Sequence, residues 1–216
     1  MKTPRLLNLS ALASLSLLAA ITIVGYAILP ADAQMPVHWG PDGAADFHMA
    51  RNWALLVPVA VILFIGVAFQ IVLQRGLHGE RAAPSLRTAF AGLALLMAAL
   101  QAGAIAITLG FALDMVRLVV FALGVLLIVL GNILPKSQPN AFAGMRLPWT
   151  LDDPANWQAT NRLSGILMMV GGFAMALAAL LIGDKAWLFA ITALGIVGPL
   201  LAGVLFSYRL SRQGRV

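Results

Sequence analysis

The sequence predicts an all-α integral membrane protein with six transmembrane helices and with both termini in the cytoplasm. The 216-residue chain is 61% hydrophobic and only 10% charged, and its mean hydropathy is +0.93, which is far too apolar for a soluble domain of this size. Its apolar runs are long enough to cross a hydrocarbon core about 30 Å thick. Its basic residues gather in alternate connecting segments, as the positive-inside rule requires.

The first apolar run, from Leu6 to Leu29, has 24 residues without a charge and predicts the first membrane helix. Lys2 and Arg5 precede this run and Ala31-Asp32-Ala33 follows it, so a cleaved signal peptide is an alternative interpretation. The run is longer than the core of about 7 to 15 residues that is typical of signal peptides. This length favours a helix that is retained.

Residues 31–52 predict an acidic, turn-rich outer loop. Pro41-Asp42-Gly43 predicts a turn, because proline presets one central φ angle and glycine accepts a positive one. We expect this loop to pack on the helices, or to bind an extracellular ligand through His38, Trp39 and Asp46. A metal site is a third interpretation, since imidazole and carboxylate groups bind zinc or manganese; its ligands would be His38, Asp42, Asp46 and His48. Their spacing matches no metal motif, so we predict neither a metal nor another cofactor.

Five further apolar runs predict the remaining helices, over residues 53–73, 88–109, 118–134, 163–182 and 186–208. Pro58 predicts a kink in the second helix. Gln101 lies in the middle of the third and is expected to face protein, because an unsatisfied amide is costly in hydrocarbon. Asp114 and Arg117 are spaced to pair on one helical turn. Small residues recur along the fifth helix and predict close helix packing; they are Gly165, Gly172, Ala176, Ala179 and Gly183.

The charges agree with both termini and the second and fourth loops in the cytoplasm. Eleven of the 14 basic residues then lie inside: Lys2, Arg5, Arg75, Arg81, Arg87, Lys136, Arg146, Arg162, Arg209, Arg212 and Arg215. The second loop, residues 74–87, is a basic inner loop that also holds His78 and Glu80. Only Arg51, Arg117 and Lys185 lie outside, where five of the eight acidic residues are also found. The net charge of +6 therefore reports membrane orientation and predicts no direct contact with nucleic acid.

The most polar part of the chain is a signature loop of about 30 residues, from Gly131 to Arg162. Asp153 followed by Pro154 predicts an N-cap and a first helical residue. Trp149 and Trp157 beside Arg146 fit the lipid headgroup zone, where a guanidinium also binds phosphate or carboxylate. Lipid anchoring alone is one interpretation of this loop.

The residue order in this loop resembles the signature of the SdpI family of bacterial membrane proteins. The matching residues are Gly131-Asn132, Leu134-Pro135-Lys136, Pro139-Asn140, Gly144-Met145-Arg146, Pro148-Trp149-Thr150-Leu151, Trp157, Thr160 and Arg162-Leu163-Ser164-Gly165. Upstream, Leu29-Pro30, Met35-Pro36-Val37-His38-Trp39, Gly43 and Asp46 resemble the uncharacterised N-terminal domain usual in that family. Two residues depart from the pattern: Asn161 stands where the family usually has His, and Leu147 where it usually has Thr.

The resemblance implies two units: an N-terminal two-helix unit over residues 1–88 that carries the outer loop, and an SdpI-like four-helix unit over residues 89–216 that carries the signature loop at the cytoplasmic face. It also implies an immunity protein of the bacterial cytoplasmic membrane, which protects against a secreted killing peptide and also sequesters a cytoplasmic transcriptional repressor. The candidate residues in the signature loop are Asn132, Pro135, Asn140, Gly144, Arg146, Pro148, Trp149, Thr150, Trp157, Thr160 and Arg162. In the outer loop they are His38, Trp39 and Asp46.

Two other classes of function stay open. A small transporter or channel would use polar or kinking residues in or beside the helices, namely Pro58, Gln101, Asn132 and Asn161. A membrane-embedded enzyme would bind an anionic group through Arg146 and use His38 or Asp46 as acid or base, but these groups lie on opposite faces of the predicted topology. The sequence contains no recognisable nucleophile–base–acid set, so we predict no enzyme.

Overall fold

The computed structural model describes residues 5–75, 79–140 and 142–213, without the side chains of residues 75, 79 and 80. Six of the described helices are long and apolar enough to cross a membrane, which confirms the predicted helical fold with six candidate membrane spans; the cytoplasmic position of both termini stays a prediction. They are α1 (Leu9–Ile28), α2 (Arg51–Arg75), α3 (Gly79–Thr108), α4 (Met115–Ile133), α6 (Pro154–Leu181) and α7 (Lys185–Gln213). The shorter elements are β1 (Gln34–Trp39), β2 (Ala45–Ala50), a 3-10 turn over Leu134–Lys136, and α5 (Pro148–Asp152).

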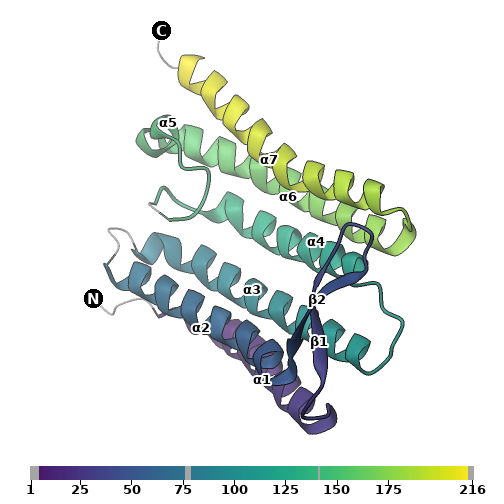
Figure 1. The fold of residues 1–216 in the computed structure, drawn as a ribbon. Coiled ribbons are helices and arrows are strands. Elements are labelled where there is room, and N and C mark those ends of the chain that lie inside the picture. Colours follow the sequence, from purple (N-terminus) through teal and green to yellow (C-terminus); the bar gives the residue numbers. More distant parts are fainter. Residues whose placement is uncertain (1–4, 76–78, 141, 214–216) are drawn as a thin grey trace.

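The long helices form two adjacent groups. Figure 1 shows α1, α2 and α3 together on one side, and α4, α6 and α7 on the other, with α3 beside α4. The two strands lie across one end of the helices, whereas α5, the α4–α6 connection and the last described turn of α7 lie at the opposite end (Figure 1). The predicted division after residue 88 falls within α3, which packs against α1 and α2.

The helix predicted from residue 88 begins earlier, at Gly79. Arg81 and Arg87 therefore lie on α3, and the predicted basic loop over residues 74–87 is mostly helix. Glu, Arg and Ala are good helix formers, so the helix continues beyond the apolar run. The side chain of Glu80 lies outside the described residues, as do Lys2, His78 and Arg215, and the side chain of Arg75.

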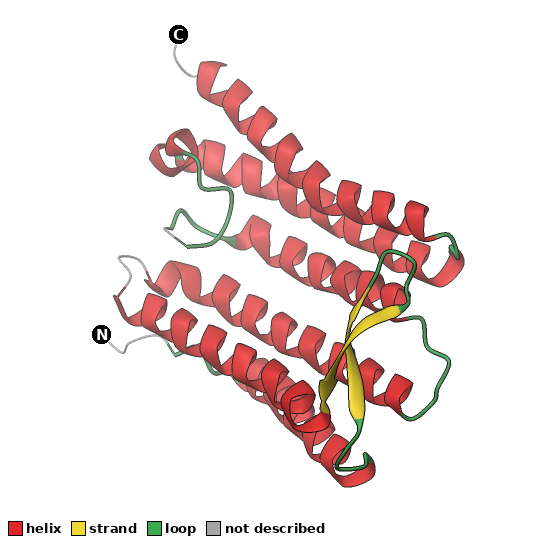
Figure 2. Cartoon of the chain, in the orientation of Figure 1, coloured by secondary structure: helices red, strands yellow, loops and turns green. Residues whose placement is uncertain are grey.

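The segment predicted as an irregular outer loop contains an antiparallel β-hairpin (Figure 2). The turn predicted at Pro41-Asp42-Gly43 is confirmed: Gly43 has a φ of +81°, and its N–H donates to the Gly40 carbonyl at 2.9 Å. Arg51 secures the base of the hairpin, because its guanidinium donates to the Leu29 carbonyl at 2.8 Å and stacks over the Tyr26 ring at 5.3 Å. Irregular pairing between residues 36 and 39 interrupts the alternation that would have predicted a strand.

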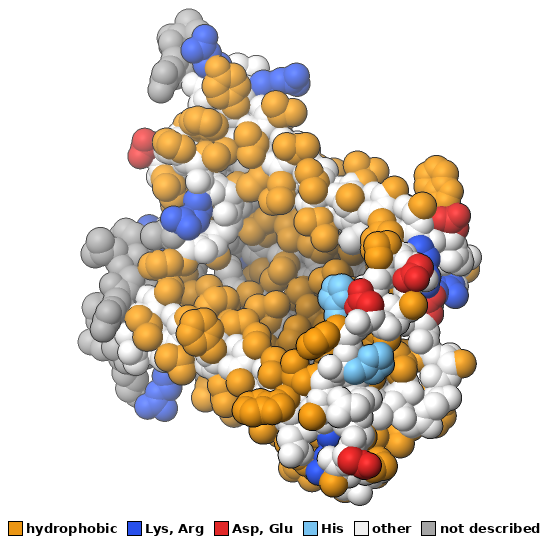
Figure 3. Space-filling model, in the orientation of Figure 1, with side chains coloured by type: hydrophobic (Ala, Val, Ile, Leu, Met, Phe, Trp, Pro, Cys, Tyr) orange, Lys and Arg blue, Asp and Glu red, His pale blue; other side chains and the backbone are white. Residues whose placement is uncertain are grey.

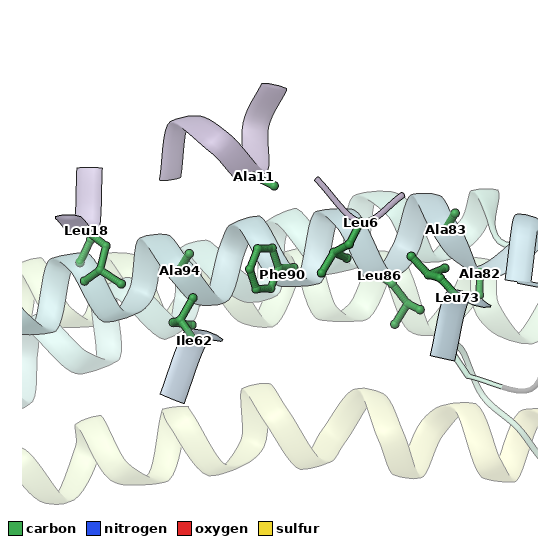
Figure 4. Close-up of a cluster of buried hydrophobic side chains, with 11 residues drawn as sticks. Leu6, Ala11, Leu18, Ile62, Leu73, Ala82, Ala83, Leu86, Phe90 and Ala94 are labelled. Atoms are coloured by element: carbon green, nitrogen blue, oxygen red, sulfur yellow. The ribbon is translucent and has the colours of Figure 1, made fainter. Parts of the chain in front are cut away.

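The first helix group is held by an apolar core around α3 (Figure 4). Phe90 of α3 is 2% exposed and packs with Leu18 of α1 and Ile62 of α2, which are each 1% exposed. Ala94 of the same helix is fully buried and makes room for its neighbours. Because α1 contributes to this core, it packs as an integral helix of the group.

The second helix group is held by glycines at the α4–α6 crossing. A Cβ atom at Gly124 would lie 2.6 Å from the Gly172 carbonyl oxygen, and one at Gly131 would lie 2.5 Å from that of Gly165. The backbones thus approach too closely for any side chain. The packing role predicted for Gly165 and Gly172 is confirmed, whereas Gly183 lies beyond α6 with open space around it.

Candidate functional site

Trp157 is the buried centre of the signature loop. Its side chain is fully buried, and its indole N–H donates to the Ser137 carbonyl at 3.0 Å. The loop residue Gly144 lies against the ring, at a φ of +108° and so close that a Cβ there would be 2.8 Å from Trp157 Cζ2. The headgroup position predicted for Trp157 is therefore wrong, because the loop folds back over the ring.

Asn161 holds the same loop from the next turn of α6. Its Oδ1 accepts from the Met145 N–H at 2.8 Å, and its Nδ2 donates to the Trp157 carbonyl at 2.9 Å. The side chain is fully buried. Asn161, one of the two residues that depart from the family pattern, therefore has a structural role in this chain.

Two further side chains give the loop its turns. Asn140 accepts from the N–H groups of Phe142 and Ala143, at 2.8 Å each. Thr150 accepts from the Leu147 N–H at 2.9 Å and donates to the Met145 carbonyl at 2.6 Å. Both side chains are buried and hydrogen-bonded, which is the condition for burying a polar group at low cost.

The loop is also attached to the end of α7. Trp149 donates from its indole to Ser207 Oγ at 3.1 Å and packs edge-on against Tyr208 with the ring centroids 5.7 Å apart. Asn156 donates to the Ser207 carbonyl at 3.0 Å and accepts from Thr160 at 2.9 Å. The predicted N-cap at Asp153 is confirmed, since its carboxylate accepts from the Ala155 and Asn156 N–H groups.

The structure separates the predicted signature-loop residues into two sets. The buried set is Asn140, Thr150, Trp157 and Thr160. The exposed set is Asn132, Arg146, Pro148 and Arg162. Three further residues have intermediate exposure: Pro135, Gly144 and Trp149. Arg146 makes no hydrogen bond or ion pair with the described residues. The exposed set is the part of the loop that a partner or a lipid headgroup can reach.

The hairpin at the other end carries a second polar site. His38 Nδ1 lies 2.5 Å from Asp46 Oδ1, and the two side chains are 69% and 52% exposed. Trp39, beside them, is half-buried. No three potential metal ligands come together within the described parts of the chain, and the geometry shows a two-residue pair.

The cations near the hairpin are already engaged. Lys185 donates to Asp114 at 2.6 Å, and Arg117 donates to the Ala179 and Leu180 carbonyls at 2.7 Å each, so the predicted Asp114–Arg117 side-chain pair is wrong. Asp114 instead caps α4 through the Arg117 N–H. Asp32, Asp42, Asp46 and Asp184 are exposed and have no Lys or Arg partner among the described residues.

Lys185 also supports the hairpin tip. A Cβ at Gly43 would lie 2.6 Å from both Cε and Nζ of Lys185, so the turn rests on the side chain that pairs with Asp114. Partial burial raises the pKa of the Asp114 carboxyl. The hydrogen bonds from Lys185 and from the α4 backbone N–H groups lower this pKa, as does the positive charge of Lys185. The lowering effects are larger together, so the pKa lies below its usual value of 3.8. The contact between Gly43 and Lys185 thus connects the hairpin tip to the second helix group, and the ion pair with Asp114 holds Lys185 in place.

The Asp114→Asn variant is expected to lower the free energy of unfolding by at most about 1 kcal/mol at pH 7. Asparagine still caps the helix, so the change removes mainly the ion pair. Because the folded pKa is depressed, the contribution is complete above pH 3.8 and is lost as the pH falls through the folded pKa. Unfolding of both proteins in detergent between pH 7 and pH 3 tests this, and a difference that does not begin to shrink below pH 3.8 would contradict it.

An apolar cleft of about 520 Å³ lies beneath the hairpin, between the two helix groups. The hairpin and four helices line it: Met35 to Trp39 and Met49 from the hairpin, Ala54, Val57 and Pro58 from α2, four residues of α3, five of α4, and Phe189 and Thr192 from α7. Figure 3 shows the corresponding hollow, which is surrounded by hydrophobic side chains. Nothing in the sequence indicated this cleft, because its lining residues are ordinary core types spread from position 35 to 192.

Gln101 lies in the wall of the cleft and faces protein, as predicted. It is 3% exposed and donates to Thr22 Oγ1 at 3.0 Å and to the Leu55 carbonyl at 3.3 Å. The other polar residues named for transport both belong to the signature loop: Asn132 is exposed, and Asn161 is fully buried. Likewise Arg146 and the His38–Asp46 pair lie at opposite ends of the helices, so they do not form one active site (Figure 1).

Comparison with known proteins agrees with the resemblance in the signature loop. The model of the SdpI/YfhL protein family matches residues 136–208, from the 3-10 turn after α4 to the last turns of α7. The immunity protein SdpI of Bacillus subtilis (strain 168) is 23% identical over 163 residues, which is 76% of each chain. No solved structure matches the chain. Over residues 136–208, which hold most of the signature loop, all of α6 and most of α7, this multi-pass membrane protein is similar to the SdpI/YfhL family.

Proposed function

We propose that this chain is an immunity protein of the bacterial cytoplasmic membrane and that it protects the cell against a secreted killing peptide. The observation that carries the proposal is the similarity to an immunity protein over about three quarters of both chains. Six helices able to span a membrane support it.

The charge distribution supports an orientation with the signature loop in the cytoplasm. Eight described cations belong to the end with the signature loop and the chain termini: Arg5, Arg81, Arg87, Lys136, Arg146, Arg162, Arg209 and Arg212. The positive-inside rule assigns such an end to the cytoplasm. The hairpin then faces the outside, where a secreted peptide arrives.

The hairpin end suits a cationic, amphipathic peptide. Its exposed carboxylates have no Lys or Arg partners among the described residues, so the negative potential is available to steer a cationic ligand. His38, Trp39 and Asp46 remain our candidates for this contact.

The signature loop supplies the cytoplasmic surface. Arg146 and Arg162 are exposed beside a rigidly hydrogen-bonded scaffold, which is a suitable surface for a protein partner. A cytoplasmic transcriptional repressor is the kind of partner that the resemblance implies. Signalling by the peptide through this surface requires two states of the helices that bind the peptide with different affinity.

We expect both Arg146→Ala and Trp149→Ala to abolish protection while the protein still inserts into the membrane. Arg146 has no partner in the described structure, so its loss removes a surface contact without removing an internal one. Removal of an arginine or tryptophan anchor typically weakens an interface by at least about 2 kcal/mol, or about thirtyfold. The measurement is survival of a sensitive bacterium that expresses each variant and is challenged with spent medium from the source strain.

Arg209→Ala is the matched control, because Arg209 is also exposed at this end of the protein. It is expected to leave survival unchanged. Normal protection by both signature-loop variants would remove the loop from the mechanism. An absence of protection by the wild-type protein, with its insertion confirmed, would contradict immunity against that medium and favour transport.

A further inference from the structure

The cleft beneath the hairpin has the depth of about one membrane leaflet. On α4 its wall extends from Met115 to Leu123, which is about 12 Å at about 1.5 Å per residue. One leaflet contributes about 15 Å of hydrocarbon to a bilayer core. The cleft therefore runs from the membrane surface at the hairpin toward the middle of the bilayer.

The cleft opens sideways. Figure 3 looks onto the flanks of the helices and shows the hollow from that side. Val57 of α2 and Phe189 of α7 line the cleft and are still 43% and 44% exposed. In helices that span a membrane, such a mouth faces lipid, and an apolar wall offers water few hydrogen-bond partners. Hydrocarbon is thus the material that fills it.

The surface end of the cleft favours a positive group. His38 lines the cleft, and Asp46 lies 2.5 Å from its Nδ1. Arg51, Arg117 and Lys185, which are close to this end, are bonded elsewhere. An ammonium group forms a charge-assisted hydrogen bond with such a carboxylate, whereas a headgroup with only negative charge is repelled.

From these three features we propose that the cleft binds one phospholipid of the outer leaflet, with an acyl chain between the two helix groups and a primary ammonium headgroup at Asp46. Phosphatidylethanolamine has this chemistry. A peptide with a lysine beside an apolar segment shares part of it, but a phospholipid already lies in the plane of the mouth and needs no insertion step. The site shares His38, Trp39 and Asp46 with the peptide contact proposed above, but the lipid is inferred from the cleft and not from the immunity function.

The test reconstitutes the full chain in vesicles of equal phosphatidylethanolamine and phosphatidylglycerol, extracts it in mild detergent and counts the bound lipids by native mass spectrometry. The wild-type protein is expected to retain one lipid, with phosphatidylethanolamine enriched about threefold, as for a partly exposed charge pair. Asp46→Asn is expected to remove the enrichment while a lipid is still retained. Equal retention of both lipids by the wild-type protein would overturn the headgroup assignment.

A pair of variants tests the position of the lipid's acyl chain in the cleft. Val57→Trp places a large side chain in the cleft, whereas Val61→Trp makes the same change one turn along α2, at a position that is 42% exposed and outside the lining. Only Val57→Trp is expected to lose the lipid, with both variants as helical as the wild type. Equal retention of lipid by the two variants, or no lipid bound to the wild-type protein, would overturn the proposal. A peptide would then be the remaining candidate ligand of the cleft.

Discussion

Replacement of Trp157 by alanine is expected to release the signature loop and to lower the free energy of unfolding by about 3–5 kcal/mol, the usual effect of removing a buried aromatic side chain. The indole fills the space beneath Gly144 and donates to the Ser137 carbonyl. Its loss leaves both a cavity and a buried carbonyl without its partner. Among the described residues of the signature loop, no other side chain combines this size with complete burial.

Limited trypsin digestion in detergent measures this release, because the bond after Arg146 becomes cleavable when the loop is no longer held. Trp187→Ala is the control: it makes the same change at a side chain that is 65% exposed, and we expect neither faster cleavage nor a large loss of stability. Wild-type cleavage kinetics in the Trp157 variant would show that the remaining hydrogen bonds, from Asn140, Thr150 and Asn161, suffice to hold the loop.

Gly124→Ala is expected to lower the free energy of unfolding by about 2 kcal/mol, within the range for overpacked interiors. The added Cβ meets the Gly172 carbonyl oxygen at 2.6 Å and the Ala176 nitrogen at 3.0 Å. Both are backbone atoms, so α4 and α6 must separate and the packing along their whole crossing is weakened. Unfolding in detergent, followed by loss of helicity, measures the effect.

Gly198→Ala provides the comparison on α7. There the nearest atom to an added Cβ is the flexible Leu194 Cδ1 at 3.6 Å, so we expect no loss, and a gain of up to about 1 kcal/mol from helix propensity. Equal effects of the two substitutions would mean that the close α4–α6 approach is absent in the folded protein.

Local patterns predicted several features correctly. The inward orientation of Gln101, the Asp153 cap and the turn at Gly43 were all predicted from a residue's type and a few neighbours. The hairpin strands were missed because a bulge breaks the alternation of β1. The partner of Asp114 was wrong because Lys185, 71 residues away, competes with the neighbour on the same helix turn.

The signature loop shows a different limit. Its composition identified it as the most distinctive part of the chain, but Trp149 and Trp157 were given the same position. The structure places Trp157 inside the loop and Trp149 against Ser207 and Tyr208. The sequence does not distinguish the two tryptophans of one polar stretch, because the path of the loop backbone determines which ring is covered.

By itself, the sequence predicted six helices long and apolar enough to span a membrane, because the transfer of each residue between water and hydrocarbon depends mainly on that residue and its near neighbours. Only the tertiary structure decided which signature-loop residues face outward, and that the hairpin covers a cleft between the two helix groups. These features arise from contacts between residues far apart in the chain. Many apolar surfaces have equal hydropathy, and van der Waals packing, through the shapes of the side chains, determines which of them come into contact.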